Sequence, residues 1–127
     1  MAASLEHTNL SVSDPARTAQ MLVDLFGWHI RWQGPALGDG LSIHVGTEDA
    51  YLAIYGQPGK MREGKESSYV TVGGLNHIGV VVDDLDAAEA KVSAAGFTPH
   101  SHADYEPGRR FYFDDHDGIE FEVVTYD

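Results

Sequence analysis

The chain contains an internal repeat, and this repeat limits the possible folds more strongly than any other feature of the sequence. Segment 6–12 can be aligned with segment 76–82, which places His77 at the position of His7. After each segment an aspartate leads into a helical pattern of apolar residues that ends at a glycine. Because a repeated pattern indicates a repeated structural unit, we expect two halves of similar structure.

Each half is predicted to run strand, helix and three further strands (βαβββ), which makes the fold class α+β. Asp14 can cap the first helix, and Asp84 or Asp86 the second. One apolar stripe is expected on each helix, formed by Ala19, Leu22, Val23 and Phe26 in the first and by Leu85, Ala88, Val92 and Ala95 in the second. Alternation of apolar and polar residues predicts the later strands at about 28–33, 41–46 and 50–56, and at about 97–101, 109–114 and 119–125.

The stretch between the two halves is polar and rich in turn formers and charges. We interpret it as a linker at about 57–74 within a single domain, 1–127. The first module then covers about 5–56 and the second about 75–127. The linker can also act as a hinge across which two chains exchange halves, and a homodimer is expected.

The composition argues against several partners and chemistries. With 8 basic and 20 acidic residues the formal net charge is −12, which repels nucleic acids and anionic membrane surfaces. No apolar run approaches the roughly 20 residues of a membrane span, and no signal-peptide pattern is present, so a cytoplasmic protein is expected. The absence of cysteine excludes disulfides, thiolate metal sites and a cysteine nucleophile.

Polar side chains lie on one face of three predicted strands. On the first strand His7 and Asn9 face away from the apolar side. His77 takes the matching place in the second half, and Glu122 points away from the apolar side of the last strand. If the two halves face each other, His7, His77 and Glu122 can converge as a set suited to Fe, Mn, Ni, Zn or Co. Alternatively, each is a separate surface or hydrogen-bonded residue without a metal.

The repeat also bears on the number of ligands. Ala53 stands at the first-half position equivalent to Glu122 and cannot bind a metal. A fourth protein ligand would have to come from His44 or Glu48 in the adjacent hairpin. We therefore expect three protein ligands and room for a substrate that chelates through two oxygens. No site role is expected for the other histidines, which are His29, His100, His102 and His116.

In these segments the sequence resembles the vicinal oxygen chelate superfamily, which includes glyoxalase I, bleomycin resistance proteins, extradiol dioxygenases and fosfomycin resistance enzymes. The matching stretches are 7–14, 75–85 and 110–122. The resemblance implies two βαβββ modules whose strands form a cupped mixed sheet around one divalent metal. His7, His77 and Glu122 would be the metal ligands.

The resemblance also implies an activity. Glyoxalase I enzymes have a glutamate where this chain has Ala53, so extradiol dioxygenases and the fosfomycin enzymes, which use His, His and Glu, are the better match. We therefore expect a metal-dependent enzyme that is closer to the extradiol dioxygenases than to glyoxalase I. The alternatives are a glyoxalase-type lyase or isomerase, and a metal-free protein that sequesters a small molecule such as an antibiotic.

The resemblance places a tyrosine beside the substrate, and Tyr112 matches it. Tyr112 would donate a hydrogen bond to the substrate or act as an acid, and Glu122 would be a ligand first and a base second. Ordinary packing on the sheet is the alternative for Tyr112. The predicted substrate contacts are Asn9, Tyr51, Tyr55 and Arg110. Cross-strand packing is the alternative for the two tyrosines, and solvated charge is the alternative for Arg110.

Overall fold

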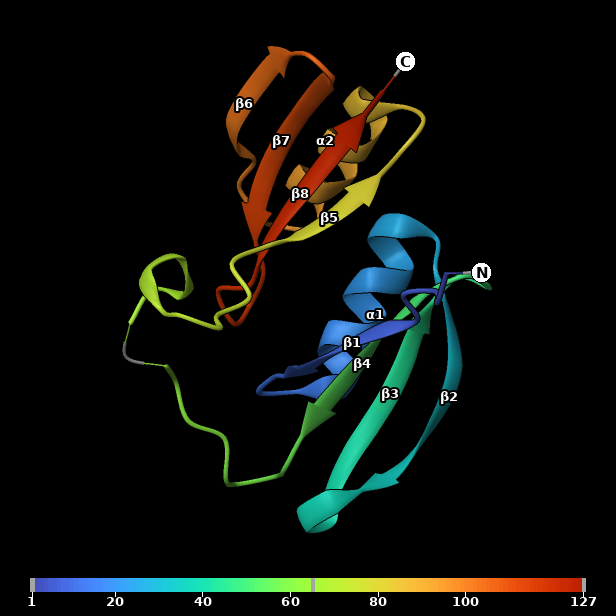
Figure 1. Cartoon of the computed structure of the whole chain (residues 1–127), viewed down its shortest axis with the longest axis vertical. Coiled ribbons are helices and arrows are strands. Elements are labelled where there is room, and N and C mark those ends of the chain that lie inside the picture. The colour runs from blue at the N-terminus through green and yellow to red at the C-terminus, as the bar shows by residue number, and fades with distance from the viewer. Residues whose placement is uncertain (1, 65, 127) are drawn as a thin grey trace. The chain divides into compact units, whose positions relative to one another are not determined.

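The computed structural model describes residues 2–64 and 66–126 of the chain. It consists of two compact units, residues 1–63 and 64–127, which meet in the chain at a position inside the stretch 57–74. Each unit has its own helix, four-stranded sheet and apolar core (Figure 1). In the part of the chain that is described, no helix has both the length and the apolar character needed to cross a membrane.

The first unit is a mixed sheet with one helix. Its elements are β1 (His7–Ser11), α1 (Pro15–Phe26), β2 (His29–Ala36), β3 (Gly40–Gly46) and β4 (Tyr51–Gly56), with a short 3-10 helix at Leu37–Asp39. The strand order is β1-β4-β3-β2, in which β1 and β4 are parallel and the other pairs are antiparallel. Helix α1 packs mainly against β3 and β4, so it covers one face of the sheet.

The second unit repeats this arrangement. Its elements are β5 (Ile78–Val81), α2 (Leu85–Ala94), β6 (His100–Tyr105), β7 (Gly108–Asp114) and β8 (Glu120–Thr125), preceded by a short 3-10 helix at Ser68–Val70. The strand order is β5-β8-β7-β6, with β5 and β8 parallel. The predicted α+β fold with two βαβββ modules is therefore confirmed.

Aspartates begin both helices, as the sequence predicts. Asp14 accepts a hydrogen bond from the backbone N–H of Arg17 at 3.2 Å, and Asp84, rather than Asp86, caps α2 by accepting from the N–H of Ala87 at 3.0 Å. These bonds satisfy N–H groups that have no partner within the helix. Helix α1 ends at Gly27, whose φ of 69° is a left-handed conformation that favours glycine.

The predicted apolar stripes are only partly correct. In α1, Met21 and Leu25 are buried with Ala19 and Leu22, whereas the predicted Val23 and Phe26 are half-buried. The helix therefore presents a face rotated from the one predicted. The other misplaced residue is Ala95, which is exposed because α2 has already ended at Ala94.

One predicted strand starts at the wrong residue. The strand expected at about 97–101 is β6 and begins only at His100. Phe97 instead belongs to the loop after α2, where its ring packs on Phe113 with centroids 5.6 Å apart. Phe97 therefore packs against the core from the loop and is not part of the strand that the period-two pattern predicted.

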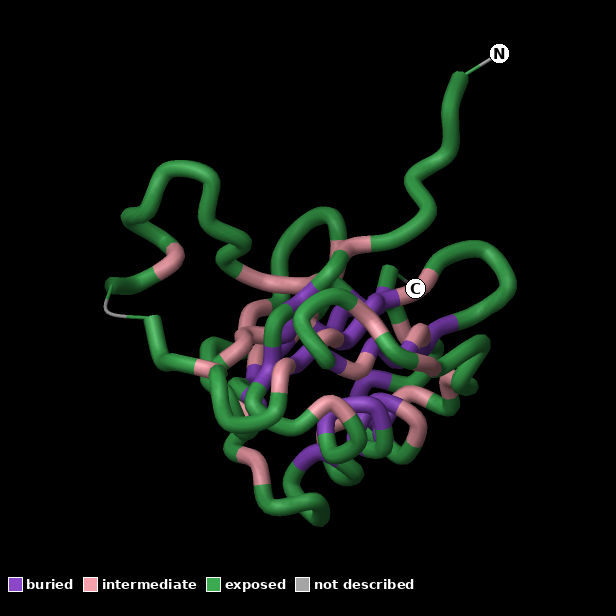
Figure 2. The backbone as a smooth tube through the Cα atoms, turned by 90° about the horizontal axis from the view of Figure 1, so that it is seen from below, coloured by how far each residue is buried: buried purple, intermediate pink, exposed green. Residues whose placement is uncertain are grey.

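Most buried residues lie on the strands and helices, while the stretch 57–75 is mostly exposed (Figure 2). In the second unit the core is built on Phe111, Phe113 and Phe121, which are all fully buried. The rings of Phe113 and Phe121 stack with centroids 5.2 Å apart. Because successive strand residues point to opposite faces, these phenylalanines direct their neighbours Arg110, Tyr112 and Glu122 to the face that the helix does not cover.

Candidate functional site

Each sheet has one face under its helix and one face that the helix leaves uncovered. We call the uncovered face of the β1-β4-β3-β2 sheet the first open face and that of the β5-β8-β7-β6 sheet the second open face. His7, Asn9 and Ser11 of β1 lie on the first open face, opposite Tyr51, Ala53 and Tyr55 of β4, respectively. The alternation of residues in the sequence predicts this placement.

Aromatic rings form a continuous row on the first open face. His7 stacks on Tyr51 with centroids 4.9 Å apart, and His44 of β3 stacks on the same tyrosine at 4.6 Å. Trp32 of β2 then contacts His44 at 5.0 Å. The inner rings cover one another, whereas Trp32, at the end of the row, is about half exposed and can stack on a planar group.

His7 is held from one side. Its Nδ1 atom lies 2.8 Å from Oε1 of Glu6. A contact at Nδ1 leaves Nε2 for another partner, which is the usual arrangement of an imidazole that binds a metal.

Of the two residues considered as replacements for a ligand at Ala53, only His44 lies beside it. His44 is the direct cross-strand partner of Ala53. Burial, assisted by the charges of His7 and Arg31, lowers the pKa of His44, so its imidazole is neutral at pH 7. Glu48 lies in the turn between β3 and β4 and pairs with His29 at 3.4 Å.

The hydroxyl of Tyr55 already has two hydrogen-bond partners in the chain. Its hydroxyl donates a hydrogen bond to the carbonyl of Leu37 at 2.7 Å and accepts one from the side-chain amide of Gln57 at 2.6 Å. Asn9 is exposed on the same face.

The second open face carries an acid held between two basic groups. Glu122 of β8 has its Oε1 atom 3.1 Å from Nε2 of His77, which directly precedes β5. Its Oε2 atom accepts a hydrogen bond from a guanidinium nitrogen of Arg110 on β7 at 2.7 Å. Only 13% of the Glu122 side chain and 11% of the Arg110 side chain are exposed.

The pair formed by His77 and Glu122 fits a divalent metal. Two ligand atoms that bind one metal at right angles, with bonds of about 2.1 Å, lie about 3.0 Å apart. The separation of 3.1 Å between Nε2 of His77 and Oε1 of Glu122 is close to this value, and it is also that of an ordinary hydrogen bond between the two groups. Nitrogen and carboxylate donors suit the borderline divalent ions of the first transition row.

Tyr112 lies next to this pair. It is the direct cross-strand partner of Glu122, and the edge of its ring contacts the ring of His77 with centroids 5.8 Å apart. Burial, together with the negative charge of Glu122, raises the pKa of Tyr112. The phenol therefore stays protonated at neutral pH and can donate a hydrogen bond.

A second donor set lies on the same face and was missed by sequence reasoning. It comprises His100, Asp114 and Glu120, whose ligand atoms all lie within 4.8 Å of one another. Asp114 and Glu120 are direct cross-strand partners, and Tyr69 donates a hydrogen bond to Glu120. Asp114 and Glu120 lie on either side of the Asp117-Gly118 turn, so the expected hairpin could have predicted that they face each other. No feature of the neighbouring sequence predicts the contact between Tyr69 and Glu120.

The predicted ligands belong to both units. His77 and Glu122 lie together in the second unit, whereas His7 belongs to the first. The structure brings His77 and Glu122 into contact, and the assignment of His7, His77 and Glu122 as metal ligands stays a prediction.

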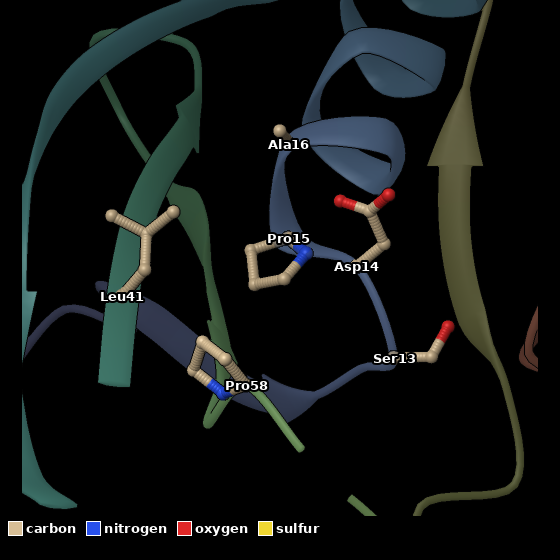
Figure 3. A pocket seen from close by; sticks show the side chains of 7 residues that line it. Ser13, Asp14, Pro15, Ala16, Leu41 and Pro58 are labelled. Carbon is tan, nitrogen blue, oxygen red and sulfur yellow. The ribbon is translucent and has the colours of Figure 1, made fainter. Parts of the chain in front are cut away.

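A pocket of about 330 Å³ lies at the beginning of α1 (Figure 3). Its lining is formed by Ser13, Asp14, Pro15, Ala16, Leu41, Gly56 and Pro58. The only charged side chain among them, Asp14, already caps α1. The pocket shares no residue with the donor sets described above, and it offers no group suited to acid–base or metal chemistry.

Solved structures with the same fold include a fosfomycin resistance protein and an antibiotic binding protein. A glyoxylase/bleomycin resistance protein/dioxygenase domain from Frankia sp. EAN1pec has a TM-score of 0.82 at 18% identity, with full coverage of both chains. TnmS3, an antibiotic binding protein from Streptomyces sp. CB03234, has a TM-score of 0.76 at 21% identity, covering 100% of this chain and 99% of that one.

The fosfomycin resistance protein FosX from Listeria monocytogenes, solved in complex with Mn(II) and a sulfate ion, has a TM-score of 0.72 at 19% identity. The match covers 98% of this chain and 93% of FosX. Among curated proteins no significant match is found. At these levels of identity the likeness shows the fold alone.

The family follows from the sequence as a whole. Residues 4–123 match the sequence model of the Glyoxalase/Bleomycin resistance protein/Dioxygenase superfamily, a range that covers the first module, the linker and nearly all of the second module. This match agrees with the repeated βαβββ fold and with the resemblance of the segments around His7, His77 and Glu122. The chain therefore belongs to the Glyoxalase/Bleomycin resistance protein/Dioxygenase superfamily.

Proposed function

We propose that the chain is a divalent-metal-dependent enzyme acting on a small substrate that chelates the metal through two neighbouring oxygens. The observation that carries this proposal is the 3.1 Å separation between Nε2 of His77 and Oε1 of Glu122 on the second open face. This separation suits two ligands of one metal. His7, which aligns with His77 in the internal repeat and lies on the first open face, is the proposed third ligand.

The proposed ligands are His7, His77 and Glu122, and the metal is one of Fe, Mn, Ni, Zn or Co. When bound, the metal would polarise the substrate oxygens and stabilise the negative charge that develops on them. Two imidazoles and one carboxylate leave coordination positions open, which a chelating substrate requires.

The chain's own groups then act on the substrate. Tyr112 is protonated and lies beside Glu122, so it is placed to donate a hydrogen bond to a substrate oxygen or to protonate it. Arg110 adds positive charge that favours an anionic substrate. The further substrate contacts are Asn9, Tyr51 and Tyr55 on the first open face.

An extradiol-type dioxygenase is the preferred reaction class. Ala53 provides no fourth ligand, which separates the chain from glyoxalase I. A glyoxalase-type lyase or isomerase is the alternative, and His44 is then the residue that would compensate for Ala53, because the two are direct cross-strand partners.

Metal content tests the proposal. Purified protein loaded with Mn(II), Fe(II), Co(II), Ni(II) or Zn(II) under anaerobic conditions should retain about one ion per chain, measured by plasma mass spectrometry after desalting. His77→Ala and Glu122→Gln should lose most of this ion, and His7→Ala should weaken its binding. His102→Ala is the matched control, because His102 pairs with Glu89 at 3.0 Å and is not a proposed ligand.

Retention of the metal by all three ligand variants would overturn the site. With metal-loaded protein, oxygen uptake in the presence of catechols supports ring cleavage. Loss of the hemithioacetal of methylglyoxal and glutathione without oxygen uptake supports the lyase or isomerase.

A second candidate function is metal-free sequestration of a planar ligand. The row formed by His7, Tyr51, His44 and Trp32 on the first open face favours it, because aromatic rings bind planar groups by stacking. Titration of the metal-free protein with bleomycin, followed by tryptophan fluorescence, tests this function. Saturable quenching that is lost in Trp32→Ala but kept in Trp28→Phe would support it, whereas the absence of saturable quenching would exclude sequestration of this ligand.

A further inference from the structure

The guanidinium of Arg110 is fixed on three sides. One nitrogen donates to Oε2 of Glu122 at 2.7 Å, and another donates to the carbonyl of Gly108 at 3.3 Å. The carbon of the guanidinium lies 4.9 Å above the centre of the Tyr105 ring. Because 89% of its side chain is shielded from solvent, Arg110 has little freedom to leave this position.

This arrangement divides the two oxygens of Glu122 between different partners. Oε2 faces Arg110, and Oε1 faces Nε2 of His77. A free carboxylate can bind a metal through one oxygen or through both. As long as Arg110 occupies Oε2, only Oε1 is available on the side of His77.

The number of oxygens used by Glu122 matters for the substrate. A site with two imidazoles and a carboxylate that binds through one oxygen keeps three positions of an octahedron open. A carboxylate that binds through both oxygens leaves two positions, which a chelating substrate fills, so none remains for a third ligand such as dioxygen. Limiting Glu122 to one oxygen therefore keeps a third position open beside a chelating substrate.

We propose that Arg110 is a positioning residue that restricts Glu122 to one-oxygen metal binding and thereby keeps a coordination position open beside a chelating ligand. The inference rests on the metal site proposed above and adds a role for Arg110 toward Glu122 to its contribution of positive charge. The neighbouring Arg109 provides the contrast, since it is exposed and, among the described residues, its ion-pair partner is Asp86, at 3.8 Å.

Cobalt substitution gives a readout that is independent of turnover. Co(II)-loaded wild-type protein is compared with Arg110→Met, Arg110→Lys and Arg109→Met by visible absorption and by titration with 4-nitrocatechol, a coloured two-oxygen chelator. In Arg110→Met we expect the Co(II) spectrum to change, both in the metal-loaded protein and in its 4-nitrocatechol complex, because Glu122 can then bind through both oxygens. Loss of the Arg110 charge should also weaken the binding of this anionic chelator.

The remaining variants separate positioning from general damage. Arg110→Lys keeps a cationic donor and should restore most of the spectrum and of the chelator affinity, whereas Arg109→Met should match the wild type throughout. A wild-type spectrum and wild-type chelator affinity in Arg110→Met would overturn the role of Arg110 while leaving the metal site intact. If the wild-type protein takes up no Co(II), both the metal site and this inference are wrong.

Discussion

Replacing Glu122 by glutamine tests whether the contact between Glu122 and Arg110 stabilises the second unit. The substitution keeps the shape of the side chain and an oxygen that can accept from Arg110, but it removes the charge. The Arg110 side chain, of which only 11% is exposed, then has a neutral acceptor instead of a carboxylate at 2.7 Å. The metal-free protein should therefore be less stable.

The size of the effect follows from the geometry. A hydrogen bond to a charged group contributes about 1.5–3 kcal/mol and a neutral one about 0.5–1.5 kcal/mol, so the expected loss is roughly 1.5 kcal/mol. For a protein of this length that loss corresponds to a Tm lower by about 6 °C. Because the pair is largely shielded from solvent, the difference should persist in 1 M salt, where an exposed pair would be screened.

Thermal unfolding followed by circular dichroism in the presence of EDTA measures the effect without a contribution from bound metal. Glu89→Gln is the control, because its pair with His102 is more exposed and should contribute about 0.5 kcal/mol or less. A double-mutant cycle with Arg110→Met should give a coupling of about 1–2 kcal/mol between the two residues. A Tm for Glu122→Gln equal to that of the wild type, or strictly additive variants, would refute the reasoning.

Three further predictions concern stability and are measured by urea unfolding. Burial raises the pKa of Asp115, so this residue favours the folded state at low pH and loses that contribution as the pH rises through its folded pKa. Asp115→Asn should therefore raise the free energy of unfolding at pH 7 and raise it less near pH 3; an equal effect at both pH values would contradict this. Phe121→Ala removes a fully buried ring that stacks on Phe113 and should lower the free energy of unfolding by about 3–5 kcal/mol. An unchanged urea midpoint would contradict this prediction. Asp84→Ala removes the cap of α2 and should cost about 1 kcal/mol, whereas Asp84→Asn, which keeps an acceptor, should cost less.

The repeat and the local patterns were sufficient to predict the fold. Each βαβββ module follows from short-range rules: an aspartate that caps a helix, a glycine that ends it, and alternation that identifies strands. The same alternation places Asn9 and Glu122 on the faces that the helices leave uncovered. These features depend on backbone geometry over a few residues, so the sequence alone contains them. The rotated stripe of α1 shows the limit of such rules, because the sheet, and not the helix pattern, selects Met21 and Leu25 for burial.

The tertiary structure decided which side chains meet. The contact between Arg110 and Glu122 requires the register of β7 against β8, in which Tyr112 faces Glu122 and Arg110 faces Val124. Tyr69 reaches Glu120 across 51 residues of chain, and no local signal encodes such a contact. Alternation determines the face of a strand on which a residue lies, because it is a property of one strand. Partners are determined by the pairing of strands and by the path of the chain between them, which depend on the packing of the whole unit.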